Sequence, residues 1–220
     1  MINSVANINS SQPLKSPSGD LGVVLSCFYL APIEYYSALF RAKSAVIEIH
    51  DNYQKQSYRN RCIIAGANGP LSLSIPIEKP ETAKSHMKDI RIADHGNWRH
   101  LHWNAIMSAY NSTPFFEYYA DDLQPFYEKK TLFLVDFNFQ LHQLVCSWLQ
   151  VNTPTILSTE YTTEVPEGIS DFRETIHPKR PSGFTTRPYY QVFKEKLGFI
   201  QNASIIDLLF NMGNEARLYL

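Results

Sequence analysis

Residues 22–50 read GVVLSCFYLAPIEYYSALFRAKSAVIEIH, and this stretch decides the fold. The apolar run Gly22–Leu30 is typical of a buried strand. Pro32 then opens a helical stretch, where its missing N–H costs nothing, and basic residues close that stretch. Residues 44–50 alternate in the manner of a second strand. A strand, a helix and a strand within about thirty residues predict a βαβ unit at the start of the domain.

A hairpin is predicted after the βαβ unit, and helical patterns fill the second half of the chain. Asn68-Gly69 is a strong turn signal between the runs RNRCIIA and LSLSIPI, and Pro76 places the second run at a sheet edge. The residues DIRIAD (89–94) predict a short further strand. Helical spacing predicts helices over residues 96–110, 114–130, 131–151, 187–200 and 204–216. Trp98, Leu101 and Ala105 share the expected inner face of the first helix, and Pro125 is expected to end or kink the second.

The order of these elements predicts an α+β fold with an α/β opening. We expect a single domain over residues 21–220, with a small mixed sheet from the βαβ unit and the hairpin, packed by the C-terminal helices. Residues 1–20 are rich in Ser, Asn and Pro and predict a disordered leader. Residues 152–188 are polar and irregular, which is typical of a lid or of a long surface excursion.

The bulk composition describes an ordinary soluble protein and removes several classes of function. The formal net charge of −1 over 220 residues gives no general electrostatic reason to bind nucleic acid or an anionic membrane. No apolar run approaches the roughly 20 residues of a membrane span, and the N-terminus lacks the pattern of a signal peptide. Three cysteines, odd in number and far apart, favour a reducing cytoplasm over a disulfide framework. The oligomeric state is left open.

The segment YQKQSYRNR (53–61) is the strongest pointer to a ligand. On a strand, Arg59 and Arg61 would point to the same side with their Cα atoms roughly 6–7 Å apart. Two guanidinium groups at that spacing can bind one phosphate, sulfate or carboxylate, and Lys55 would add to the charge. The alternative is a solvated strand face whose arginines pair with local carboxylates. The segment therefore predicts an anionic small-molecule ligand but no reaction.

The chemistry-bearing residues outside this segment are few. His102 lies four residues after Trp98 on a predicted helix, so it is either a packed core residue or a general base. Asp207 lies within the apolar SIIDLLFNMG and is expected to be buried, bonded to backbone or arginine. The histidines show no ligand spacing, so neither a metal nor another cofactor is predicted.

Six motifs in order give the chain a resemblance to the WbqC-like proteins, from about Val23 to the C-terminus. They are YLAPIEYY (29–36), YQKQSYRNR (53–61), SIP (74–76), the pair Trp98 and His102, Y-x3-PFF (110–116) and SIIDLLFNMG (204–213). The family is associated with gene clusters for bacterial surface polysaccharides (O-antigens). The resemblance therefore implies a role in polysaccharide biosynthesis.

The family pattern falls on Tyr53, Asn60, Arg61, Trp98, His102, Tyr110, Pro114 and Asp207. The chain departs from it at Ser26, at Glu34, where relatives carry glycine, and at Ile49-His50, where relatives carry two aspartates. If those acids take part in chemistry elsewhere, this chain either lacks the activity or uses His50 instead.

The leading hypothesis is an enzyme that transfers an acyl or aminoacyl group to a sugar or nucleotide-sugar precursor. His102 would be the general base, oriented by Tyr110 or Asp207. The nucleotide-sugar or acyl donor would be held by Tyr53, Lys55, Arg59, Asn60, Arg61 and Trp98. The alternative hypothesis is a non-catalytic ligand-binding or assembly partner of polysaccharide enzymes.

Overall fold

The computed structural model describes residues 22–80, 82 and 84–220. The predicted leader at residues 1–20 lies outside the described residues. Four parallel strands form the main sheet in the order β5-β2-β1-β6: β1 (Gly22–Ser26), β2 (Ala45–Glu48), β5 (Thr155–Leu157) and β6 (Ile169–Asp171). A separate antiparallel pair joins β3 (Arg61–Gly66) to β4 (Gly69–Ser74). The sheets and the helices around them confirm the predicted α+β class.

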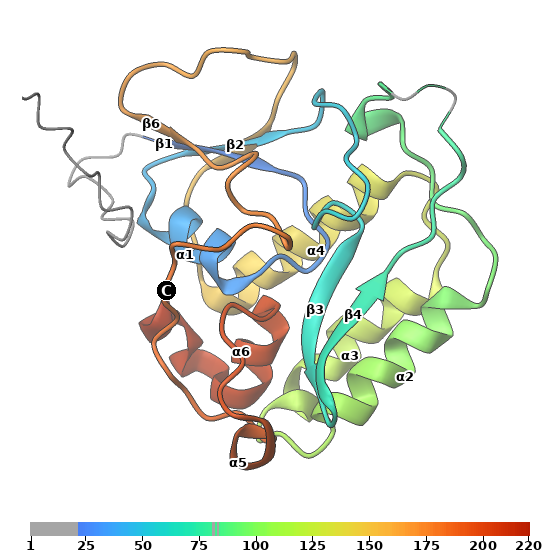
Figure 1. The fold of residues 1–220 in the computed structure, drawn as a ribbon, viewed down its shortest axis with the longest axis vertical. Helices are drawn as coiled ribbons and strands as arrows, with labels where there is room; N and C mark the ends of the chain where they lie inside the picture. The colour runs from blue at the N-terminus through green and yellow to red at the C-terminus, as the bar shows by residue number, and fades with distance from the viewer. Residues whose placement is uncertain (1–21, 81, 83) are drawn as a thin grey trace, which may run out of the picture.

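The predicted βαβ unit is confirmed. Strand β1 pairs in parallel with β2, with Val23 opposite Ala45 and Ser26 opposite Glu48. Helix α1 (Ile33–Arg41) connects the two strands and packs beneath the sheet in Figure 1. Every residue of β1 is buried, as expected for a central strand covered on both faces.

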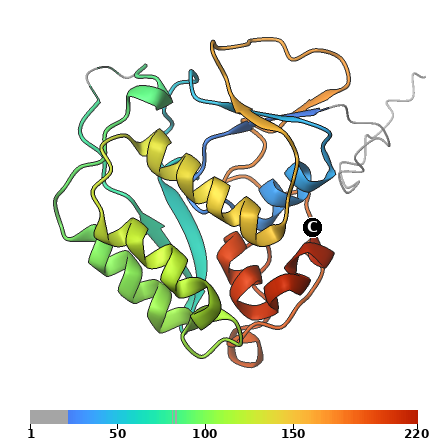
Figure 2. The same ribbon diagram turned by 180° about the vertical axis from the view of Figure 1, so that it is seen from behind.

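Helices enclose the hairpin and the core on the remaining sides. They are α2 (Trp98–Tyr110), α3 (Phe116–Glu128), α4 (Leu134–Leu149), α5 (Lys194–Leu197) and α6 (Ile205–Met212), with 3-10 turns at η1 (Met87–Asp89) and η2 (Gly213–Tyr219). Helix α4 crosses the back of the molecule, and α2 and α3 lie side by side next to the hairpin (Figure 2). Helix α6 is apolar on nearly all sides and is buried accordingly. The Ser204 N–H donates to the carbonyl of Ile63 on β3 (2.8 Å), which ties α6 to the hairpin.

Three predictions about local structure are wrong. Residues 152–188 are not wholly irregular, because β5 and β6 lie within them and form both edges of the main sheet. Residues 89–94 make only isolated bridges, at Ile92 and Arg91, after the 3-10 turn. The expected helix at 187–200 is reduced to the single turn α5, because Pro188 and Gly198 interrupt the pattern.

The inner face of α2 also differs from the prediction. Leu101 is 59% exposed, whereas His102 and Ile106 are buried beside Trp98. Helix α3 continues past Pro125 to Glu128. The spacing of α4 is as expected, with Leu134, Phe137 and Leu141 in the core.

Candidate functional site

Polar side chains gather where the strands of the parallel sheet end. Ser26 is the last residue of β1 and Glu48 the last of β2, Ser158 follows β5, and Arg173 follows β6. Because the strands are parallel, their carboxyl ends meet at one edge of the sheet. Ligands of open parallel sheets bind outside this edge. The carboxyl edge is therefore the first place to look for a site.

Arg59 is fixed in the centre of this edge. Its guanidinium is ion-paired with the Asp51 carboxylate, and its Nη2 donates to the Ser26 hydroxyl (3.1 Å). The Ser26 hydroxyl in turn donates to Asp51 Oδ2 (3.2 Å). Arg59 is 1% exposed and Asp51 6% exposed. Because charges taken out of water need a partner, the pair accounts for the burial of both residues.

Arg173 organises the neighbouring part of the edge. It binds Asp171 through Nε and Nη2, and its Nη1 lies 3.5 Å from Glu48 Oε2. The other oxygen of Glu48 accepts the backbone N–H of His50 and the hydroxyl of Ser158, both at 2.7 Å. The buried Glu48 carboxylate thus holds together the ends of β2, β5 and β6.

A small pocket opens over this network, and we call it the carboxyl-edge pocket. It has a volume of about 200 Å³ and is lined by His50, Asp51, Asn52, Gln54, His86, Tyr161 and Glu174. The ring of His86 is oriented by a hydrogen bond from its Nδ1 to the carbonyl of His50 (2.5 Å). Carboxylates, amides, imidazoles and one phenol therefore converge on a space large enough for a small polar group.

Asp51 is the unusual member of this lining. Its Oδ1 is buried and has no hydrogen-bond partner among the described residues, while Oδ2 takes the bonds from Arg59 and Ser26. Burial raises the pKa of Asp51 above its ordinary value, although the Arg59 charge acts in the opposite direction. A carboxyl group with a raised pKa and a free lone pair can accept a proton from a ligand once the lining exposes that oxygen, which is sealed from solvent in this structure.

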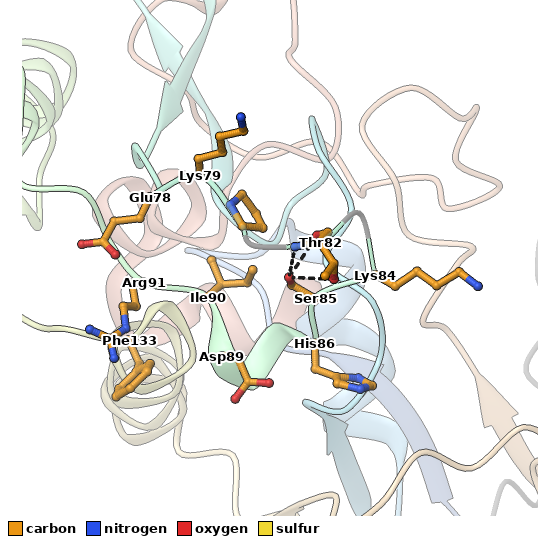
Figure 3. A pocket seen from close by; sticks show the side chains of 11 residues that line it. Glu78, Lys79, Thr82, Lys84, Ser85, His86, Asp89, Ile90, Arg91 and Phe133 are labelled. Atoms are coloured by element: carbon orange, nitrogen blue, oxygen red, sulfur yellow. Dashed lines mark hydrogen bonds between the residues drawn. The ribbon is translucent and has the colours of Figure 1, made fainter.

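A larger hollow of about 820 Å³ lies beside the pocket and shares His86 with it. Figure 3 shows the Lys79 and Lys84 side chains at its rim extending in different directions. Arg91 instead lies over the ring of Phe133, 5.5 Å from its centroid. These cations do not converge on one point, so the hollow has no fixed anion clamp.

The family profile of the WbqC-like proteins matches residues 28–177, which is more than half of the chain. The chain belongs to the WbqC-like protein family. The resemblance predicted from the sequence is thereby confirmed. The matched span includes most of the carboxyl edge but not Ser26 or Asp207.

A relative of this WbqC-like protein occurs in Mycobacterium tuberculosis, under the name Uncharacterized protein Rv1507c. It is 26% identical over 213 residues, a stretch that covers 84% of this chain and 91% of the relative. No solved structure matches the chain significantly. In the part of the chain that the structure describes, no helix is long and apolar enough to cross a bilayer. Within the same residues no three His, Cys, Asp or Glu side chains are grouped to hold a metal ion.

The expected pairing of Arg59 and Arg61 on one strand face is wrong. Strand β3 begins only at Arg61, and Arg59 lies in the turn before it. Arg59 is buried and neutralised by Asp51, whereas Arg61 is partly exposed and donates from Nε to the Ser74 hydroxyl (3.1 Å). The alternative that the arginines pair with local carboxylates therefore holds for Arg59.

The lining of the carboxyl-edge pocket includes none of the other predicted binding residues of this WbqC-like protein, and Trp98 is buried against His102 on α2. Tyr53 is half-buried, and burial raises its pKa. Lys55 is exposed, and the Asn60 side chain donates to the carbonyl of Ile75 (2.8 Å). Asn60 thus fixes the chain between the turn and the hairpin.

His102 lies in an aromatic cluster. It is 5% exposed, packs edge-on against Trp98 and is hydrogen-bonded through Nδ1 to the Tyr29 hydroxyl (3.0 Å). Burial lowers the pKa of His102 to about 4. The arrangement is that of a packed core histidine, which was the alternative weighed for this residue.

Tyr110 and Asp207 come together, but in a different place. Burial and the Asp207 charge raise the pKa of Tyr110, and the Asp207 carboxylate accepts bonds from Tyr189 and Gln191. Tyr110 lies eight residues after His102 on α2, about 12 Å along the helix axis. The three residues predicted to be catalytic therefore do not form one constellation.

Sequence reasoning missed Asp51, Glu48 and Arg173 as members of the site. A usable signal was present, because Glu48 ends β2 and Asp51 follows three residues later, at the carboxyl end of a predicted parallel strand. Arg173 gave no such signal, since β6 itself was not predicted.

Proposed function

We propose that this protein is an enzyme of bacterial surface-polysaccharide biosynthesis that binds a sugar precursor in the carboxyl-edge pocket and transfers an acyl or aminoacyl group to it. The observation that carries the proposal is the Asp51 carboxyl group, which has an unpartnered oxygen, a raised pKa and a place in the pocket lining. The association of WbqC-like proteins with O-antigen gene clusters supports the choice of a sugar as ligand.

The lining suits a carbohydrate. Sugar hydroxyls need many hydrogen-bond donors and acceptors, and Asn52, Gln54 and Glu174 supply them. Tyr161 is half exposed and is held by Arg173, whose Cζ lies 5.2 Å from the ring centroid. An aromatic ring fixed at the edge of such a pocket can pack against a sugar ring. A volume of about 200 Å³ fits one sugar unit rather than a whole nucleotide-sugar.

The anionic part of a nucleotide-sugar would extend past His86 over the larger hollow. Lys79, Lys84 and Arg91 line that hollow together with the acids Glu78 and Asp89, and the excess of one positive charge would attract a diphosphate without a fixed clamp. This assignment replaces the role first expected for Arg59, because the Arg59 guanidinium is already paired with Asp51.

The proposed reaction is a direct transfer. Asp51 Oδ1 is buried beneath the pocket, so the step requires the lining to move aside and expose it. Oδ1 then takes the proton from a sugar hydroxyl or amine, and the freed lone pair forms a bond to the carbonyl carbon of an acyl thioester. The carbon–sulfur bond breaks, and the proton passes from Asp51 to the departing thiolate. An acyl-enzyme is disfavoured, because the Ser26 hydroxyl is buried under Arg59 and the thiols of Cys27 and Cys62 are buried with raised pKa values. Direct transfer requires a base and two bound substrates, but no protein nucleophile.

The test is a titration of the protein with nucleotide-sugars and acyl thioesters, followed by amide NMR signals and by product formation. We expect the signals of Asn52 and Gln54 to shift, and Asp51→Asn to retain binding while the transfer rate falls about 100-fold or more. Asp121→Asn, an exposed acid on α3, is the matched control and should change neither quantity. No binding of any of these compounds, or an active Asp51→Asn variant, would overturn the proposal.

A second candidate function is a ligand-binding or assembly partner without chemistry. It is favoured by the absence of an accessible Ser or Cys nucleophile in the described lining of the pocket. In that case, Asp51→Asn should leave glycan production in a complemented deletion strain intact, whereas a variant that fills the pocket, such as Asn52→Trp, should abolish it.

A further inference from the structure

A second cavity lies on another side of the molecule, next to the start of α1. It has a volume of about 360 Å³, within the range of small-molecule sites. Its lining comes from α1, the hairpin and the segments around residues 177–184 and 200–202. The carboxyl-edge pocket shares no lining residue with this cavity. We call it the Glu34 cavity.

Glu34 is a buried carboxylate in this lining. It is 6% exposed, and its Oε2 accepts hydrogen bonds from the Ser182 hydroxyl (2.8 Å) and the Asn202 amide (3.0 Å). No described residue donates to its Oε1, and that atom is not among those sealed off from solvent. One oxygen of a largely buried carboxylate is thus left to a group inside the cavity. A ligand that displaces water from this oxygen must therefore supply a hydrogen-bond donor in its place.

The carboxylate is held rigidly in this position. Asn202 Oδ1 accepts the backbone N–H of Glu34 (2.9 Å) while its amide donates to the side chain of the same residue. Asn202 has a left-handed backbone (φ 48°), and its own N–H donates to the Thr186 hydroxyl (2.9 Å). The side chain of Asn202 therefore has little freedom to turn away, and the geometry of Glu34 is set before any ligand arrives.

The remaining wall combines an apolar part with the polar side chains of His177, Arg180 and Gln201. The Arg180 guanidinium lies 3.7 Å from the Glu174 carboxylate, which partly offsets its charge. Ile63, Phe184 and Ile200 line the cavity together with the Tyr58 phenol. Burial, with a contribution from the Glu34 charge, raises the pKa of Tyr58 to about 12, so this phenol stays uncharged near neutrality. On this side of the cavity a ligand would meet one carboxylate oxygen and a surface of hydrocarbon and ring, with His177, Arg180 and Gln201 on the rest of the lining.

We infer that the Glu34 cavity is a binding site for an organic ammonium ion with an apolar or aromatic body. The ammonium group would donate to Glu34 Oε1, and the body would pack against Ile63, Phe184 and Ile200. A charge-assisted bond to a pre-positioned carboxylate, combined with apolar burial, is the recognition that such a ligand needs. The inference does not depend on the reaction proposed at Asp51.

The probe is phenethylamine, titrated into the full chain by calorimetry and amide NMR. We expect saturable binding with shifts at Ile63 and Ile200, and affinity about tenfold or more weaker for phenethyl alcohol, its neutral counterpart. Glu34→Gln should weaken the affinity for phenethylamine by a similar factor. Glu78→Gln, which changes an exposed acid elsewhere, should leave that affinity unchanged.

Because Glu34→Gln disturbs the bonds to Ser182 and Asn202, a second variant keeps the test decisive. Ile200→Trp fills the cavity and leaves Glu34 in place, so it should also abolish binding. Equal affinity for the amine and the alcohol, or full binding by Ile200→Trp, would overturn the inference. The dispersion of the amide NMR signals and the midpoint of thermal unfolding serve as folding controls in every variant.

Discussion

Arg59 and Asp51 form an ion pair that is shut off from solvent at the carboxyl end of the parallel sheet, with the Ser26 hydroxyl bridging them. The pair fixes the loop between β2 and β3, and with it the floor of the carboxyl-edge pocket. The same contact explains why Arg59 cannot be a free anion receptor. Its positive charge is already neutralised by the Asp51 carboxylate.

Replacing Arg59 should lower the free energy of unfolding far more than replacing Arg61. Arg59→Met leaves the Asp51 carboxylate buried without its partner, which is expected to lower the free energy of unfolding by about 3–5 kcal/mol. Arg61→Met removes one exposed bond to Ser74 and should cost less than about 1 kcal/mol. Urea denaturation near pH 7 measures both. Equal losses would contradict the assignment of the buried pair.

The histidine His102 should make the fold sensitive to acid. Burial lowers its pKa to about 4 from the ordinary value of 6.5, so the folded state disfavours the proton. The resulting stability is fully present above about pH 6.5 and is lost as the pH falls toward 4, and it amounts to at most about 3 kcal/mol. His142 contributes in the same direction, for the same reason.

The measurement is the free energy of unfolding of the wild type and His102→Gln at about pH 7.5 and about pH 5. The wild type should lose more stability between the two values than the variant does. His95→Gln, an exposed histidine, should behave like the wild type. A variant with an unchanged pH slope would show that His102 takes up its proton freely in the folded state.

How far the sequence predicts this fold depends on how local the deciding contacts are. The βαβ unit is recognisable because each of its elements carries its own pattern, and the Asn68-Gly69 turn marks the hairpin. Strands β5 and β6 are three residues long and are defined only by pairing with β2 and β1. No periodicity can develop over three residues, so a sequence pattern cannot reveal them.

The candidate site was harder to predict because its key contacts are long-range. The Ser26 hydroxyl accepts from Arg59, 33 residues away, and lies 3.3 Å from the carbonyl oxygen of Arg173, 147 residues away. A basic cluster in the sequence does not show which arginine has an internal partner. The role of His102 could not be decided from the sequence for a related reason. Its hydrogen-bond partner is the hydroxyl of Tyr29, which lies 73 residues away on another segment.

The Asp207 cluster is expected to stabilise the fold rather than to take part in the reaction. Tyr189→Phe removes a donor from the buried carboxylate and leaves Gln191 as the donor to the same oxygen. Bonds to charged groups contribute about 1.5–3 kcal/mol, so a loss of that size is expected in urea denaturation. Tyr190→Phe, at an exposed neighbouring tyrosine, is the control and should cost almost nothing. A Tyr189→Phe variant of normal stability but altered ligand affinity would instead place the cluster in a binding site.

The turn after α6 should not tolerate a side chain at Gly213. This residue has φ +56°, and a Cβ there would lie 2.6 Å from the ring of Phe115. Gly213→Ala therefore combines backbone strain of about 1–2 kcal/mol with a steric clash against a side chain that is packed next to α6. Gly198→Ala is the matched control, because its φ is +75° but nothing lies within 4 Å of the added methyl group. Thermal denaturation should show a larger loss of stability for Gly213→Ala than for Gly198→Ala. In the Phe115→Ala background, where the ring is absent, Gly213→Ala should cost only the backbone strain. Equal losses for the two single variants would show that only the backbone conformation matters at the end of α6.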